Sequence, residues 1–357
     1  MTNSTKSKRI FYFDALRALA ILCVVLLHVT GHLGELMAYN GSTIYSLSGF
    51  FELFANNFFR IGVDLFLMLS GALLLGRNWN IRDFLSKRLT RIIKPFVFWS
   101  LIFTIILMLV SFFIPSLDFV NDFGIYGFLN LFWNTLMCKA PGSAVYWFFW
   151  MMFGVYLIMP IFNKWISHSN FSEIEYFLVI WLISTFFDYT LMMDCPIKLS
   201  YFTSTIGLVI LGYYLRYTDR EIFNNPLISL MMIVISNILM LSYSYIVADT
   251  TVLFGFHRYS ILEIIEVVGV FCLFKTSTFL NNPSYAVQRL VSSIAICSYG
   301  IYLTHSQIIM ATRKILHISL NFTAEYILLF TVGFILPWAL IYILSNIPVL
   351  DEYIGVK

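Results

Sequence analysis

An arginine and a histidine lie in the first apolar segment of the chain, which reads YFDALRALAILCVVLLHVTGH. Arg17 and His28 are eleven positions apart. Eleven helical steps leave only about 20° of rotation, so both side chains fall on one face, about 16 Å apart along the axis. An imidazole can act as a general base and a guanidinium can stabilise negative charge. The pair therefore predicts a catalytic site, with a structural hydrogen bond as the alternative role for His28.

Later apolar segments contain further ionisable side chains. Asp64 lies in the second segment, Glu263 and Glu266 in the eighth, and His305 in the ninth. If the helices run antiparallel, these side chains reach the same outer layer as His28. A carboxylate beside a histidine would orient the ring and stabilise its imidazolium form, and the predicted depth of Asp64 is close to that of His28 rather than that of Arg17. Structural hydrogen bonds between helices are again the alternative.

The segment from 77 to 94 is the most basic part of the chain. Arg88 and Arg91 are spaced i, i+3, so in a helix they share a face and could bind phosphate together. The alternative is a basic cluster that contacts anionic lipid headgroups, which many membrane proteins have. Spacing alone does not separate the two interpretations.

Three other kinds of chemistry lack support. His28 and His32 have the i, i+4 spacing of some zinc sites, but no third ligand follows in reach, so we predict no metal site. Neither a G-x-S-x-G pattern nor a P-loop pattern occurs, which argues against a serine nucleophile and against ATP hydrolysis. We expect no permanently bound cofactor.

The elements that carry these residues are predicted to be membrane helices. Hydrophobic residues make up 60% of the 357 and charged residues only 11%, too few to cover a soluble domain with polar surface. The net charge of +3 is too small to suggest nucleic acid as a partner. We predict an all-α, polytopic transmembrane domain that fills residues 1–357, with a short N-terminal tail over 1–10.

A helix that spans a bilayer needs about 20 mainly apolar residues, which predicts about ten spans. The predicted spans are 12–33, 58–76, 93–114, 145–163, 173–192, 201–216, 225–247, 258–275, 290–311 and 324–345. Most lysines and arginines then lie in loops on one side, so both termini are predicted to be cytoplasmic. Arg313 and Lys314 depart from this rule.

Five stretches, in chain order, resemble the type-three membrane acyltransferases, the acyl-CoA-dependent O-acyltransferases of bacterial surface polysaccharides. Besides the first segment, they are FRIGVDLFLMLSGALLL, KRLTRIIKPFVFW, YWFFWMMFGVYLIMPIF and SYGIYLTHSQII. The residues that carry the resemblance are Arg17, His28, Asp64, Ser70, Gly71, Arg88, Arg91, Tyr299, Tyr302 and His305.

The resemblance implies a ten-helix enzyme of the bacterial cytoplasmic membrane. It would transfer an acyl group, most commonly acetyl, from cytoplasmic acetyl-CoA to a hydroxyl of a surface polysaccharide or lipid-linked glycan on the other side. Under this hypothesis His28 is the general base that deprotonates the acceptor hydroxyl or organises acyl transfer, and Arg17 stabilises negative charge on the thioester or CoA side. Arg88 and Arg91 hold the CoA phosphates, and Asp64 orients His28 or Arg17.

The resemblance leaves possible accessory roles for polar residues of the later segments, namely Glu263, Glu266, Tyr302 and His305.

The sequence is also compatible with other functions. A transporter or flippase would also use intramembrane histidines and carboxylates, although the chain shows no repeated halves. A sensor or assembly subunit is a third interpretation. The acceptor, the acyl group and the existence of an acyl-enzyme intermediate stay undetermined.

Overall fold

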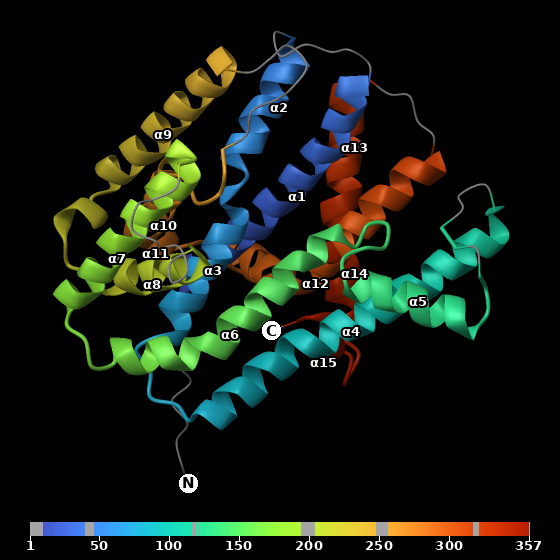
Figure 1. The fold of residues 1–357 in the computed structure, drawn as a ribbon, viewed down its shortest axis with the longest axis horizontal. Coiled ribbons are helices and arrows are strands. Elements are labelled where there is room, and N and C mark those ends of the chain that lie inside the picture. The colour runs from blue at the N-terminus through green and yellow to red at the C-terminus, as the bar shows by residue number, and fades with distance from the viewer. Residues whose placement is uncertain are drawn as a thin grey trace.

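The computed structural model describes residues 10–39, 46–115, 119–120, 122–193, 204–247, 256–316 and 321–356. These residues form helices and no strand (Figure 1). The first α-helices are α1 (Phe11–Tyr39), α2 (Leu47–Phe58), α3 (Ile61–Leu74), α4 (Ile81–Phe113), α5 (Ile125–Leu136), α6 (Trp147–Ile166) and α7 (Phe171–Thr185). They are followed by α8 (Ser204–Tyr217), α9 (Pro226–Val247), α10 (Ile261–Thr276), α11 (Thr278–Asn281), α12 (Tyr285–Leu316), α13 (Phe322–Phe330), α14 (Leu336–Leu344) and α15 (Asp351–Ile354).

Shorter helical turns join these helices. They are η2 (Ala144–Tyr146), η3 (Phe186–Leu191), η5 (Glu221–Phe223) and η6 (Thr331–Ile335). Within the described residues, eight helical segments are long and apolar enough to cross a bilayer. The shorter helices α8 and α10 occupy the other two predicted spans. The structure thus confirms an all-α membrane domain.

The second span begins earlier than predicted. The predicted spans 12–33 and 58–76 leave residues 34–57 between them as a loop, but α1 continues to Tyr39, and α2 and α3 form one apolar segment over Ser48–Leu74. The Ser46 hydroxyl caps α2 by accepting a hydrogen bond from the backbone N–H of Gly49. Asp64 therefore lies near the middle of this segment rather than close to one end.

Helix α4 also starts earlier, at Ile81 instead of residue 93. The Asn80 side chain accepts a hydrogen bond from the backbone N–H of Arg82, a cap that the sequence reading missed. The basic segment is therefore part of one long helix with the apolar part of α4. Arg88 and Arg91 lie on its N-terminal turns, which we call the basic end of α4.

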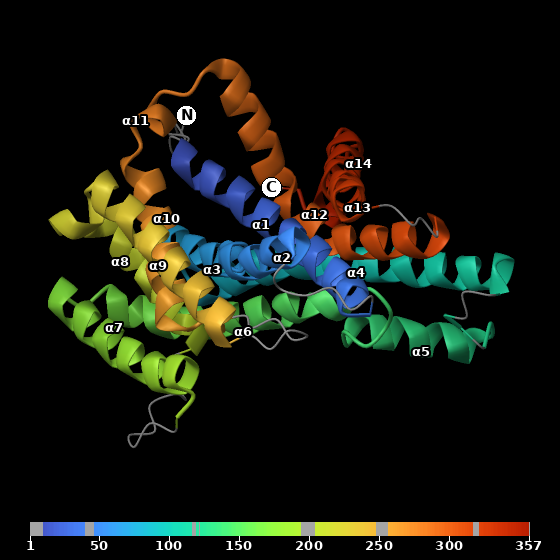
Figure 2. The same cartoon turned by 90° about the horizontal axis from the view of Figure 1, so that it is seen from above.

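Helix α1 occupies the centre of the molecule. It packs against α3 on one side and α12 on the other, as the two views agree (Figures 1 and 2). Its side chains Leu16, Ile21 and Val25 are completely buried in the main core. This arrangement places His28 of α1 beside the later part of α12.

Glycines allow the close approach of α3 and α8. A Cβ atom at Gly71 would lie 1.6 Å from the backbone oxygen of Val209, and one at Gly212 would lie 2.0 Å from that of Met68. The two backbones are therefore in direct contact, which is how small residues promote helix packing in membranes. This contact fixes the position of α3 in the bundle.

We predict that Gly71→Ala destabilises the fold by about 3 kcal/mol or more, because the added methyl group must push two backbones apart. Gly154→Ala is the matched control, since a Cβ at Gly154 meets no atom within 4 Å. Thermal unfolding of both variants in detergent measures the difference. Equal unfolding midpoints would contradict the proposed close contact.

Candidate active site

Two histidines from distant parts of the chain form the centre of the site. The Nδ1 atom of His28, on α1, lies 3.0 Å from the Nε2 atom of His305, on α12. The ring centroids are 5.0 Å apart. His305 is completely buried, whereas His28 is half-buried. The structure thus brings together the two histidines that the sequence placed at one depth.

The second nitrogen of His305 faces the backbone of its own helix. Its Nδ1 atom lies 2.8 Å from the carbonyl oxygen of Tyr302 and 3.2 Å from that of Ile301. The Tyr302 hydroxyl donates a hydrogen bond to the carbonyl oxygen of Val145. Helix α12 is thereby joined to the turn that precedes α6, and the His305 ring is held by contacts on both of its nitrogens.

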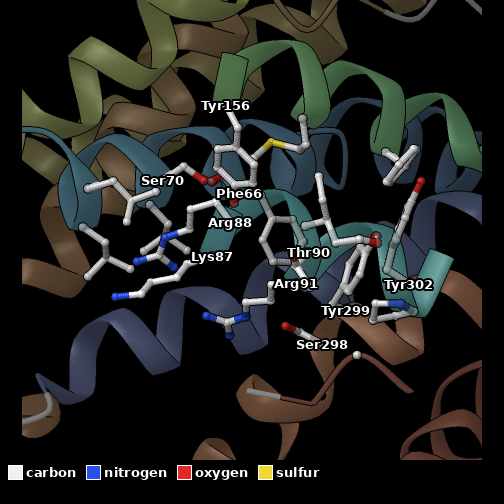
Figure 3. Close-up of a pocket in the computed structure, with 18 of the residues that line it drawn as sticks. Phe66, Ser70, Lys87, Arg88, Thr90, Arg91, Tyr156, Ser298, Tyr299 and Tyr302 are labelled. Atoms are coloured by element: carbon white, nitrogen blue, oxygen red, sulfur yellow. Dashed lines mark hydrogen bonds between the residues drawn. The ribbon is translucent and has the colours of Figure 1, made fainter. Parts of the chain in front are cut away.

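A cavity of about 720 Å³ lies near this pair, with Tyr302 of α12 in its wall. Its walls come from α1, α3, α4, α6, α12 and the C-terminal segment (Figure 3). Six cationic side chains line it, namely Arg17, Arg77, Lys87, Arg88, Arg91 and Lys94. Such a concentration of positive charge suits a ligand with several phosphate groups.

Apolar and aromatic side chains also line the cavity, among them Phe66, Phe148 and Phe149. Figure 3 shows Tyr299 and Tyr302 at the end away from Lys87 and Arg88. Because Tyr302 precedes His305 by three residues on α12, the cavity comes within one helical turn of the histidine pair. The aromatic pair Phe148 and Tyr302, with ring centroids 5.1 Å apart, forms part of this end.

Arg17 belongs to the cationic part of the cavity. One of its terminal nitrogens lies 3.4 Å from the Asp14 carboxylate, and a quarter of its side chain is exposed. Arg17, Arg88 and Arg91 all line the same cavity, although α1 and α4 are far apart in sequence. The structure therefore joins three of the predicted cationic residues in one site.

The three carboxylates that the sequence placed at the depth of His28 take no part in the hydrogen bonds of the histidine pair. Asp64, Glu263 and Glu266 are completely buried, and none of their carboxylate oxygens has a hydrogen-bond partner among the described residues. Asp64 thus makes no hydrogen bond to His28 or to Arg17. The Nδ1 atom of His28 is in contact with the Nε2 atom of His305 instead.

The C-terminal segment supplies residues that the sequence reading missed. Glu352 and Val356 line the cavity, and the Glu352 carboxylate lies 2.6 Å from the ammonium group of Lys94. The indole N–H of Trp99 donates to the carbonyl oxygen of Ile354 over 3.3 Å. No spacing pattern in the sequence pointed to these contacts, which join residues more than 250 positions apart.

Comparison with known protein families gives a match over most of the chain. Residues 10–342 match the family model described as an acyltransferase domain. No curated protein and no solved structure matches the chain. The match covers both histidines and every cationic residue of the cavity.

Proposed function

Because the chain belongs to the acyltransferase 3 family and is therefore an acyltransferase, we propose that it transfers an acetyl group from acetyl-CoA to a hydroxyl of a glycan or glycolipid. The observation that carries this proposal is the cavity, which is lined by six cationic side chains and, at Tyr302, comes within one helical turn of His305. The family membership removes the reason to prefer a transporter.

The shape and charge of the cavity support CoA as the acyl carrier. CoA has phosphate groups at one end, a long pantetheine arm and a thioester at the other end. Arg88 and Arg91, with Lys87, would bind the phosphates, and the apolar wall around Phe66 and Phe148 would hold the pantetheine. The thioester would then approach Tyr302 and the histidine pair.

His28 is the proposed general base. It takes the proton of the acceptor hydroxyl as the hydroxyl oxygen attacks the thioester carbonyl carbon, which forms the new C–O bond. The C–S bond breaks as the intermediate collapses, and the proton on His28 passes to the departing sulfur. The products are the ester and free CoA, with no net proton released. Arg17, on the cavity side, would stabilise negative charge on the thioester and CoA side.

The two substrates would reach the site from opposite faces of a bacterial cytoplasmic membrane. Lysines and arginines gather at the basic end of α4, which by the positive-inside rule would face the cytoplasm together with both termini. The donor would enter there. The acceptor would approach the half-buried side of His28 from the other face, so that the acyl group crosses part of a bilayer about 30 Å thick.

The test is transfer from radiolabelled acetyl-CoA by the purified protein in liposomes. Envelope glycans and glycolipids of a bacterial host serve as acceptors. Label in a glycan or glycolipid fraction, with one free CoA per ester, supports the proposal and identifies the fraction to purify. Folded protein that neither binds acetyl-CoA nor releases CoA would refute acetyl-CoA as the donor.

A further inference from the structure

The contacts of His305 determine where its proton lies. Its Nδ1 atom lies 2.8 Å from the carbonyl oxygen of Tyr302 and 3.2 Å from that of Ile301. A carbonyl oxygen accepts hydrogen bonds and cannot donate them. The Nδ1 atom of His305 therefore carries the hydrogen in both contacts.

The position of the hydrogen on His305 also determines the position of the hydrogen on His28. A neutral imidazole has one N–H, so the Nε2 atom of His305 has a lone pair and accepts from its neighbour at 3.0 Å. The neighbour is the Nδ1 atom of His28, which must then carry a hydrogen. The opposite direction would require His305 to be an imidazolium, and a charge on a completely buried side chain within a membrane is costly.

We propose that His305 is a positioning residue that holds His28 in one tautomer, with hydrogen on Nδ1 and the lone pair on Nε2. The proposal rests on the proposed function, because it states which nitrogen of His28 acts as the base. His305 thus takes the part that a carboxylate plays in many catalytic histidine pairs. In this protein the Nδ1–H of His305 in turn donates to a backbone carbonyl of α12, that of Tyr302.

The arrangement also accounts for the two charge states of His28. When Nε2 of His28 takes a proton from the hydroxyl, Nδ1 keeps its hydrogen and continues to donate to His305. The neutral imidazole of His305 then stabilises the imidazolium without bringing a buried negative charge into the site. When the proton leaves for the CoA sulfur, the pair returns to its original tautomers.

A kinetic comparison of two replacements tests the role. His305→Leu fills similar space but cannot accept a hydrogen bond, so kcat should fall about 10- to 100-fold, as for other residues that orient a functional histidine. The KM for acetyl-CoA should stay near the wild-type value, because His305 does not line the cavity. His305→Gln offers a side-chain oxygen to His28 and should recover most of the lost kcat. His168→Leu, at the exposed end of α6, is the matched control.

Nitrogen NMR of the histidine-labelled wild-type protein gives a readout that does not depend on activity. The signals of His28 are assigned by their loss in His28→Gln. We expect a protonated Nδ1 and an unprotonated Nε2 for His28, and a loss of this preference in His305→Leu.

Several results would overturn the proposal. They are a His28 with an unprotonated Nδ1, a His305→Leu kcat within about threefold of wild type, or a Gln variant as slow as the Leu variant. If the wild-type protein transfers no acyl group at all, the proposed function fails, whereas the NMR measurement still decides the tautomer.

Discussion

Replacement of His28 by alanine is expected to lower kcat for acyl transfer by about 10²- to 10⁴-fold, the usual contribution of a general base. The imidazole of His28 would take the hydroxyl proton, and alanine leaves water as the base at that position. The dissociation constant of acetyl-CoA should change little, because His28 does not line the cationic cavity. Single-turnover transfer at saturating acetyl-CoA, together with equilibrium binding of the donor, separates these two quantities.

His168→Ala is the control for this measurement. It removes an exposed histidine that does not line the cavity and whose Nδ1 atom lies 2.8 Å from the Lys164 carbonyl oxygen, so the variant should transfer at the wild-type rate. A His28→Ala protein that inserts normally and keeps its kcat within about threefold of wild type would exclude His28 as the base. A large rise in the donor dissociation constant would instead place His28 in the donor site.

The double replacement Arg88→Gln and Arg91→Gln is expected to weaken acetyl-CoA binding by about 10- to 100-fold, since two charge-assisted contacts to phosphate are lost. At saturating donor, kcat should remain close to the wild-type value. The loss should be smaller at high ionic strength, where salt already screens exposed charges. Donor binding and steady-state kinetics at two salt concentrations measure both effects.

The matched control removes the same amount of charge outside the cavity. Arg82 and Lys164 do not line it, so Arg82→Gln with Lys164→Gln should leave the donor dissociation constant nearly unchanged. If the control weakens binding as much as the test variant does, the basic segment acts through general surface charge. That result would favour the lipid-headgroup interpretation of Arg88 and Arg91.

The local contacts within helices were predictable because they depend on a fixed helical period. Arg88 and Arg91 are i, i+3 neighbours on α4, and both line the cavity as that spacing allows. Arg17 and His28 lie on one helix, with Arg17 in the cavity and His28 at the histidine pair. Helix α2 lies before the predicted second span, because its Phe-rich segment also contains polar residues that are typical of a loop.

The contacts between helices were less predictable because they depend on rotation and register. By predicted depth in the membrane alone, Asp64 and His305 were equally good candidates for the partner of His28. The close contact of α3 with α8 at Gly71 and Gly212 sets the place of α3, and Asp64 makes no hydrogen bond to His28. Helix α12 packs against α1 and presents His305 instead.

The sequence by itself therefore determined the membrane class, the apolar segments and the side chains that share a face within one helix. These properties follow from composition and from the 3.6-residue period, which need no knowledge of neighbouring helices. Only the tertiary structure decided that His305 is the partner of His28 and that Glu352 reaches Lys94. Such pairings depend on how closely the helix backbones approach, and that distance is set by side-chain packing across the whole bundle.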